Sequence, residues 1–262
     1  MLAFSTPVKL LTVLVSSIQI VSANTPIKWD DFWANGGHTA AVAAVPMYHF
    51  GRPRHQTPCY PQAGQTNGRQ TNGSPTTACG DLGKGCADPG PWKGQNTLGN
   101  PFPVYYTVKE CNKKVRVAYS IYYSHDSGHM SDWENVIVEW NGDGAGGWKR
   151  EGLFLGYHGK WEYLSWRDVQ NTVNGESDKF DQDAKDRDHP KVYAGAFYHA
   201  MFHTRKTSID SCINSRDEFR SNDWYLLPGN DLVQDGNLIL DGWDWGAANT
   251  NPSTLRKDLC KV

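Results

Sequence analysis

Residues 119–134, which read YSIYYSHDSGHMSDWE, constrain the fold of this chain more than any other segment. One strand-like run ends in YSIYY, a second begins with NVIVEW at Asn135, and a short polar stretch separates them. Three carboxylates and two imidazoles lie in or beside that stretch: Asp126, Asp132, Glu134, His125 and His129. A hard divalent cation prefers several oxygen ligands, some of them charged, on a rigid frame. The segment therefore predicts two neighbouring strands with a candidate cation site where they meet.

The middle of the chain contains short runs rich in β-branched and aromatic residues, which is typical of strands. We expect strands over residues 104–108, 115–123, 135–140 and 152–157. Asn141-Gly142-Asp143-Gly144 is a strong turn signal between the last two. Several short strands at this spacing predict a mainly β protein, a single-domain β-sandwich.

Helical patterns are sparser than strand patterns. A short helix is expected within residues 29–45, with further candidates at 209–220 and 254–260. The charged, poorly apolar stretch 171–188 indicates a solvated loop. Residues 53–91 are irregular and rich in Gly, Pro, Asn, Gln and Thr, and a loop this long stays ordered only if it is tied down or functional.

The N-terminal residues have the form of an export signal. Lys9 supplies the positive start, LLTVLVSSIQIV is an apolar run too short to span a bilayer, and Val21-Ser22-Ala23 fits the small-residue cleavage pattern. The alternative is a buried N-terminal strand. We therefore expect residues 1–23 to be a signal peptide and residues 24–262 to form a soluble, secreted, extracellular domain.

Charge and cysteine content narrow the class of protein further. The chain has 26 basic and 28 acidic residues, a balance that gives no electrostatic footprint for nucleic acid and no polybasic membrane anchor. An even number of cysteines behind an export signal predicts up to three disulfides, with fifteen possible pairings. The spacings do not match a paired CxxC zinc pattern. The cysteines are Cys59, Cys79, Cys86, Cys111, Cys212 and Cys260.

Several motifs follow one another in a distinctive order. GHMSDWE (128–134) resembles the heptapeptide GHRHDWE, and YSIYYSHD (119–126) is similar to YSWYFPKD. These two patterns mark the necrosis- and ethylene-inducing protein-like family of secreted microbial proteins. Other blocks resemble further family segments in the same order: TPCYPQAG (57–64), GKGCADPG (83–90), YHGKWEY (157–163), DHPKVY (188–193), YHAMFHT (198–204) and DGWDWGAANTNPSTLRKDL (241–259).

The resemblance implies a fold and a function. It implies a lectin- and cytolysin-like β-sandwich with flanking short helices, stapled by a Cys59–Cys86 disulfide. Typical members bind a divalent cation at the heptapeptide, attach to glycosylated sphingolipid headgroups of plant plasma membranes and damage the membrane. They are regarded as toxins rather than enzymes. By this resemblance the protein is a monomeric, secreted effector that contacts its target membrane peripherally.

Family roles transfer only to matching positions. The resemblance implies that one divalent cation, Mg²⁺ or Ca²⁺, is held by Asp126, His129, Asp132 and Glu134. It also places two histidines near the headgroup cleft, His158 at the rim and His199 further along. Two changes lie inside the heptapeptide, where Met130 and Ser131 replace an Arg and a His, and Ile121 replaces a tryptophan upstream. These changes leave open a secreted sugar-binding module that does not damage membranes.

The same residues can be interpreted without the family. On a strand, residues two apart face the same side, so Asp132 and Glu134 share a face while Trp133 points into the opposite layer. Asp126 and His129 lie just before and can fold over that face. Carboxylates this close repel each other, and a bound Mg²⁺ or Ca²⁺ relieves the repulsion. The alternative is a solvated acidic rim without an ion.

Two further interpretations concern sugars. Asp132 and Glu134 could act as the carboxylate pair of a glycoside hydrolase, but a tight group of four ligand-like residues fits a cation better. No G-x-S-x-G elbow occurs, and we predict no catalytic residue.

Aromatic residues near the C-terminus could form a sugar-stacking platform or a membrane-interface edge, with packing in the core as the alternative. They are Trp224, Tyr225, Trp243 and Trp245, of which we select Trp243 as a candidate ligand-binding residue.

Overall fold

The computed structural model describes residues 24–52, 55–77, 81–180, 182–205 and 223–262. The predicted signal peptide and the predicted helix at 209–220 lie outside these residues, as do Cys79 and Cys212. None of the helices in the described ranges is long and apolar enough to cross a membrane.

Seven of the described strands form the larger sheet, in the order β1-β9-β8-β7-β6-β15, with β10 also paired to β9. Strands β6 to β10 form an antiparallel meander in which each strand pairs with the next. The four predicted strands are confirmed as β6 to β9, and each is longer than expected. The strands of this sheet are β1 (Ile27–Lys28), β6 (Val104–Cys111), β7 (Lys114–His125), β8 (Met130–Gly142), β9 (Gly147–Tyr157), β10 (Lys160–Ser165) and β15 (Val233–Asp235).

The second sheet has the order β11-β12-β2-β14-β5, with β13 also paired to β12. Its strands come from distant parts of the chain, and β2 pairs in parallel with β12 and antiparallel with β14. A separate small hairpin consists of β3 (Gln65–Thr66) and β4 (Arg69–Gln70). The strands of the second sheet are β2 (Met47–Gly51), β5 (Thr97–Leu98), β11 (Thr172–Val173), β12 (His189–Ala194), β13 (Met201–Phe202) and β14 (Asp223–Leu226).

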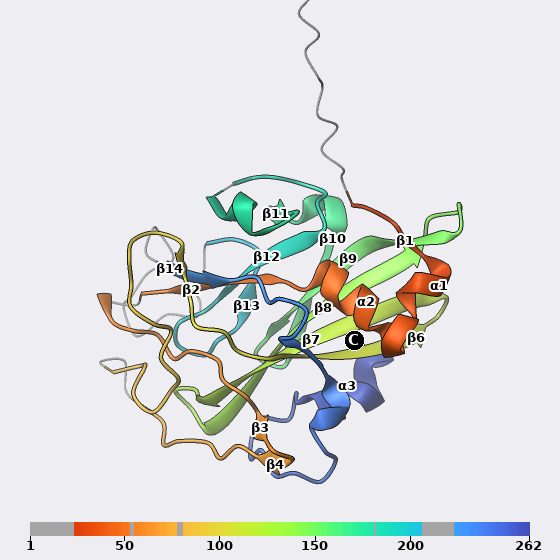
Figure 1. Ribbon diagram of the computed structural model, residues 1–262. Coiled ribbons are helices and arrows are strands. Elements are labelled where there is room, and N and C mark those ends of the chain that lie inside the picture. Colours follow the sequence, from red (N-terminus) through yellow and green to blue (C-terminus); the bar gives the residue numbers. More distant parts are fainter. Residues whose placement is uncertain (1–23, 53–54, 78–80, 181, 206–222) are drawn as a thin grey trace, which may run out of the picture.

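The hydrophobic core lies between the two sheets (Figure 1). Val117 and Val136 from the larger sheet meet Tyr48 and Val192 from the smaller one in a single buried cluster. Alternate residues of a strand point to opposite faces, so one face of each sheet supplies this core. The predicted β-sandwich is therefore confirmed.

Two short helices confirm the prediction for residues 29–45. They are α1 (Trp29–Phe32) and α2 (Ala34–Ala44). The small side chains of Ala40, Ala41 and Ala44 are fully buried in the core between the sheets. Alanine combines high helix propensity with little bulk, so α2 can approach the strands closely.

The C-terminal helix α3 (Pro252–Asp258) covers the outer face of the larger sheet (Figure 1). It starts slightly before the predicted range because the Asn251 side chain accepts hydrogen bonds from the Ser253 and Thr254 amides, while proline occupies the first helical turn. Leu255 from this helix packs with Ala118 and Ile137 of the sheet.

The charged stretch 171–188 is not wholly a solvated loop. Thr172 and Val173 form β11, which pairs with β12, and both residues are buried. The prediction is wrong for this pair because two residues are too few to produce a detectable alternating pattern in a charged segment.

Two disulfides are present in the described part of the chain. Cys59–Cys86 ties the irregular segment 53–91, as the family resemblance implied. Cys111–Cys260 ties the end of β6 to the residues after α3. Disulfides of this kind are typical of proteins that fold in an oxidising compartment.

Removing the second disulfide is expected to destabilise the protein strongly. Cys111 and Cys260 are 149 residues apart in sequence, so their bond restricts a large part of the unfolded chain. The double Cys→Ser variant should lose about 2–5 kcal/mol of unfolding free energy. Urea denaturation of the parent and variant measures the difference, and equal unfolding midpoints and slopes would contradict the prediction.

Mild acid is also expected to reduce stability, through His189. Its Nδ1–H donates to the carbonyl of Val45 at 2.9 Å and so joins β12 to the end of α2. Burial lowers the pKa of His189 below its ordinary value of 6.5, against the opposing effect of that hydrogen bond. Below about pH 6.5 the unfolded chain therefore binds a proton first, and stability falls with pH until the folded state also becomes protonated.

Thermal unfolding at pH 7.5 and pH 5 tests this effect. The parent should lose more stability on acidification than the variant His189→Gln, which keeps a hydrogen-bond donor but does not titrate. The same pH dependence in both proteins would assign the acid sensitivity to other groups.

Candidate functional site

Asp126 organises the tight turn between β7 and β8. Its Oδ1 accepts hydrogen bonds from the amides of Gly128 and His129, each at 2.6 Å. The Asp126 amide in turn donates to the His129 carbonyl at 3.0 Å. Asp126 Oδ2 lies 3.6 Å from His129 Nε2. The turn is thus held by one oxygen of the carboxylate, and the other oxygen is available to a ligand.

The orientation of the His129 ring is set by Ser131. His129 Nδ1 lies 2.8 Å from the Ser131 carbonyl oxygen, which can only accept a hydrogen bond. Nδ1 therefore carries the proton in the neutral ring, and Nε2 presents a lone pair towards Asp126. This is the tautomer that a metal-binding histidine needs.

Asp132 is held from behind by a buried histidine. Asp132 Oδ2 accepts a hydrogen bond at 2.8 Å from Nδ1 of His199, which is 3% exposed. The His199 ring stacks on Tyr123, with ring centroids 3.9 Å apart and planes 8° from parallel. Burial, reinforced by the charges of Glu134 and Asp132, raises the pKa of Tyr123 well above its ordinary value, so its hydroxyl stays neutral. The hydrogen bond from His199, whose ring stacks on Tyr123, holds one oxygen of Asp132 and leaves the other for a ligand.

Asp126, His129 and Asp132 each offer a ligand atom, and these atoms all lie within 4.8 Å of one another. We call these three residues the acidic cluster. Two carboxylates and one neutral imidazole, open on one side to the cleft, fit a divalent cation. Carboxylate oxygens suit Mg²⁺ and Ca²⁺, and the imidazole adds affinity for softer divalent ions.

The fourth predicted ligand, Glu134, lies outside this group but lines the same cleft. Its Oε2 lies 3.5 Å from the point that a Cβ atom on Gly156 would occupy. This separation is ordinary van der Waals contact, so the Glu134 carboxylate lies against β9 at position 156. The structure brings together three of the four predicted ligands and places Glu134 on the wall beside them.

Strand register explains why these residues meet. Tyr123 pairs with Asp132 and Ile121 pairs with Glu134, so both carboxylates lie on the face of β8 that also supplies the core. Trp133 points the other way and packs with Tyr122, at a centroid distance of 5.1 Å. This is the alternation expected from the strand period.

The acidic cluster opens onto a cleft with a volume of about 240 Å³. His158 lines the cleft, as expected, and its ring meets that of Tyr198 edge to face with centroids 5.1 Å apart. Trp161 and residues 247–250 also line the cleft. The cleft thus combines charged, hydrogen-bonding and aromatic groups.

The remaining predicted residues do not line this cleft. His199 lies behind Asp132, and His125 is buried with its Nε2 2.9 Å from the carbonyl oxygen of Lys84. Trp243 is half-buried and packs on Trp245, with centroids 6.0 Å apart. Trp224 and Trp245 are 2% and 4% exposed, so both belong to packed clusters.

The wall formed by residues 247–250 was not identified from sequence. The Thr250 hydroxyl donates to the Trp133 carbonyl at 2.7 Å, and the Asn135 side-chain amide donates to the Thr250 carbonyl at 2.8 Å. These bonds attach the C-terminal segment to β8 at the edge of the cleft. The motif WGAANT, which resembles the closing family segment, was the available signal, but nothing in it indicates where the segment docks.

Neither the family models nor the curated proteins give a match to this sequence. Among solved structures, one described as a toxin fold as basis for microbial attack and plant defense is 16% identical, with a TM-score of 0.50 over 85% of this chain and 87% of that chain. The non-toxic HaNLP3 protein is 17% identical, with a TM-score of 0.48 over 91% and 93%.

A third solved structure is necrosis and ethylene inducing protein 2 from the causal agent of cocoa's witches' broom disease. It is 20% identical, with a TM-score of 0.43 over 67% of this chain and 70% of that chain. At identities this low, a likeness shows only that two backbones have the same architecture. Of the three structures, we base this conclusion on the first alone. Two packed sheets, few short helices and two disulfides agree with that architecture. The chain therefore has the toxin fold of the necrosis- and ethylene-inducing-like proteins.

Proposed function

We propose that this protein is a secreted effector that binds sphingolipid sugar headgroups through a divalent cation and perturbs the plasma membrane of plant cells. The observation that carries the proposal is the acidic cluster at the cleft. Ligand atoms of Asp126, His129 and Asp132 converge within 4.8 Å in a cleft of a toxin fold. The protein acts outside the cell, as a monomer, with peripheral contact to the target membrane.

The cation, Mg²⁺ or Ca²⁺, has two roles in this proposal. It neutralises the repulsion between Asp126 and Asp132, and so keeps the turn between β7 and β8 in place. It also presents a positive centre to which vicinal sugar hydroxyls can bind, as hard cations accept neutral oxygen ligands. Glu134 accepts hydrogen bonds from sugar hydroxyls or from water bound to the ion.

The walls of the cleft suit a sugar. Trp161 and Tyr198 can pack against the C–H face of a pyranose ring, since aromatic rings favour such contacts. Asn249 and His158 provide hydrogen-bonding groups in the lining of the cleft. Most protein ligand sites combine apolar area with a few polar groups in this way. Met130, which is 52% exposed beside the acidic cluster, provides an apolar contact for the membrane.

Dye release from vesicles tests the proposal directly. Vesicles that contain plant glycosyl inositol phosphoceramides should leak in the presence of Mg²⁺ or Ca²⁺ and should stay intact with EDTA. Vesicles of phosphatidylcholine alone are the matched control and should not leak. Equal leakage with and without EDTA would separate membrane damage from the cation and overturn the proposal.

A second function is favoured by the two changed heptapeptide positions. Ser131 is buried and hydrogen-bonds to the Tyr122 hydroxyl at 3.0 Å, so it offers the cleft no ligand where the family has a histidine. A protein with this site could bind headgroups without damaging the membrane. In that case, cation-dependent binding to the glycolipid vesicles persists while no dye is released. Production of reducing ends from plant glycans would instead indicate a glycoside hydrolase.

A further inference from the structure

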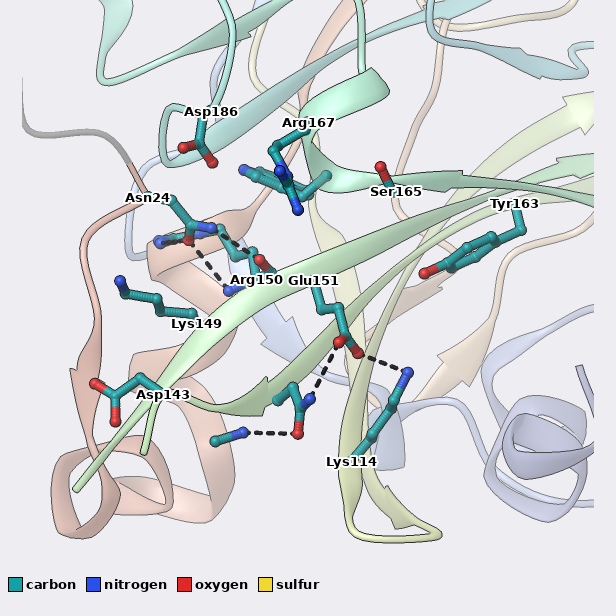
Figure 2. A pocket seen from close by; sticks show the side chains of 13 residues that line it. Asn24, Lys114, Asp143, Lys149, Arg150, Glu151, Tyr163, Ser165, Arg167 and Asp186 are labelled. Carbon is teal, nitrogen blue, oxygen red and sulfur yellow. Dashed lines mark hydrogen bonds and ion pairs between the residues drawn. The ribbon is translucent and has the colours of Figure 1, made fainter. Parts of the chain in front are cut away.

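A second hollow lies at the edge of the larger sheet (Figure 2), and it shares no lining residue with the cleft at the acidic cluster. Along this edge, β1 pairs with residues 147 and 148 of β9, and β10 pairs with residues 152–157. Among the described residues, no strand covers positions 149–151 between them. The Asn24 side chain pairs there with the backbone of Arg150: its Nδ2 donates to the Arg150 carbonyl at 2.8 Å and its Oδ1 accepts from the Arg150 amide at 3.1 Å.

This gap between β1 and β10 opens a pocket of about 590 Å³, which we call the edge pocket. Figure 2 shows it extending across β9 from Asn24 to Tyr163. None of the residues of the acidic cluster lines it. Its volume lies in the range of small-molecule sites, which is about 300–1,000 Å³.

Tyr163 provides the edge pocket with an aromatic surface. Its ring lies over Gly152 of the neighbouring strand, where a Cβ atom would be 2.4 Å from Cε2 and 2.9 Å from Cζ. Phe154 supports the ring from the side, with centroids 4.8 Å apart. Tyr163 is still 48% exposed. Tyr163 is thus a positioned aromatic platform, and only glycine at position 152 allows its placement.

The polar groups of the edge pocket are also held in position. Lys114 Nζ lies 2.6 Å from Glu151 Oε2, and the Asn141 side-chain amide donates to Glu151 Oε1 at 3.0 Å. Three basic and three acidic residues line the pocket, in addition to Arg150. Arg150 is buried, and its charge is paired with Asp188. The six exposed or half-exposed charges are Lys114, Lys149, Arg167, Asp143, Glu151 and Asp186.

We propose that the edge pocket is a second carbohydrate-binding site, specific for a neutral mono- or disaccharide and independent of metal. Balanced charges give no strong preference for an anion or a cation. They suit hydroxyl groups, which donate to carboxylates and accept from ammonium and guanidinium groups. The C–H face of a β-linked pyranose packs on Tyr163 while its hydroxyls bond to Glu151 and Arg167. The protein then has two sugar sites on separate surfaces, of which one needs a cation.

Saturation-transfer NMR in the presence of EDTA tests this site separately from the metal-dependent cleft. Cellobiose, N,N′-diacetylchitobiose and methyl α-mannoside are the probes. At least one should receive saturation from the full-length mature protein, and Tyr163→Ala should lower its affinity about tenfold. Tyr163→Phe keeps the ring and should retain binding within a few-fold. Trp33→Ala removes an exposed aromatic elsewhere and should leave binding unchanged.

Arg167→Ala provides a second test that does not alter the platform, because Arg167 is exposed. It should weaken binding several-fold without changing thermal unfolding. The proposal is overturned if none of the three probes receives saturation in EDTA, or if both Tyr163→Ala and Arg167→Ala bind as the parent does. These outcomes leave cation-dependent vesicle leakage unaffected, so the two sites are distinguished.

Discussion

Replacing Asp132 with alanine is expected to lower the affinity for Mg²⁺ or Ca²⁺ by about 100-fold. The change removes one of the two carboxylates of the acidic cluster and leaves His199 Nδ1–H without its acceptor. With one negative charge and one oriented ligand gone, the remaining Asp126 and His129 provide too few donors for a tight site. Isothermal titration calorimetry of parent and variant measures the difference.

Two further variants sharpen this experiment. Asp231→Ala removes an exposed carboxylate outside the cleft and should bind the ion as the parent does. His199→Asn keeps a donor near Asp132 but loses the stacking on Tyr123, and its affinity should fall between those of the parent and Asp132→Ala. Equal ion affinity in Asp132→Ala and the parent would exclude the acidic cluster as the cation site.

Replacing Trp133 with alanine is expected to lower the unfolding free energy by about 3–5 kcal/mol. Trp133 is 1% exposed and packs among Tyr105, Tyr122 and Trp245 on the outer face of the larger sheet. Truncation of so large a side chain loses its transfer free energy and leaves a cavity that these rings cannot close. Urea denaturation monitored by far-UV circular dichroism measures the loss.

The control for this prediction is another tryptophan. Trp33 is 42% exposed, and its ring touches Phe32 at a centroid distance of 5.3 Å. Trp33→Ala should therefore cost about 1 kcal/mol or less. Losses of similar size in the two variants would mean that the outer-face cluster does not stabilise the sheet, contrary to its burial.

The strands and the acidic cluster were predictable because their signals are local. Alternating residues in SDWE and a turn that closes on Asp126 determine which side chains share a face, whatever the rest of the chain does. Strand period is a property of a few consecutive residues. The same reasoning accounts for the correct direction of Trp133 and for the expected strands β6 to β9.

Longer-range features were less predictable. Glu134 has the spacing of a ligand, yet its carboxylate lies on the wall of the cleft, against Gly156 of the neighbouring strand, and outside the acidic cluster. His199 is 67 residues from Asp132 in sequence, and nothing near either residue indicates that they form a hydrogen bond. Thr172 and Val173 become a buried strand only because β12 lies beside them.

The sequence by itself determined the sandwich class, the principal strands and the acidic turn, because periodicity and side-chain hydrogen bonds operate within a few residues. Tertiary structure alone decided the cleft, whose walls come from β8, β9 and the C-terminal segment, and the edge pocket, which exists because β1 and β10 stop short of each other. Both depend on how sheet edges are paired and covered. That pairing is set by the packing of distant segments, so no local pattern encodes it.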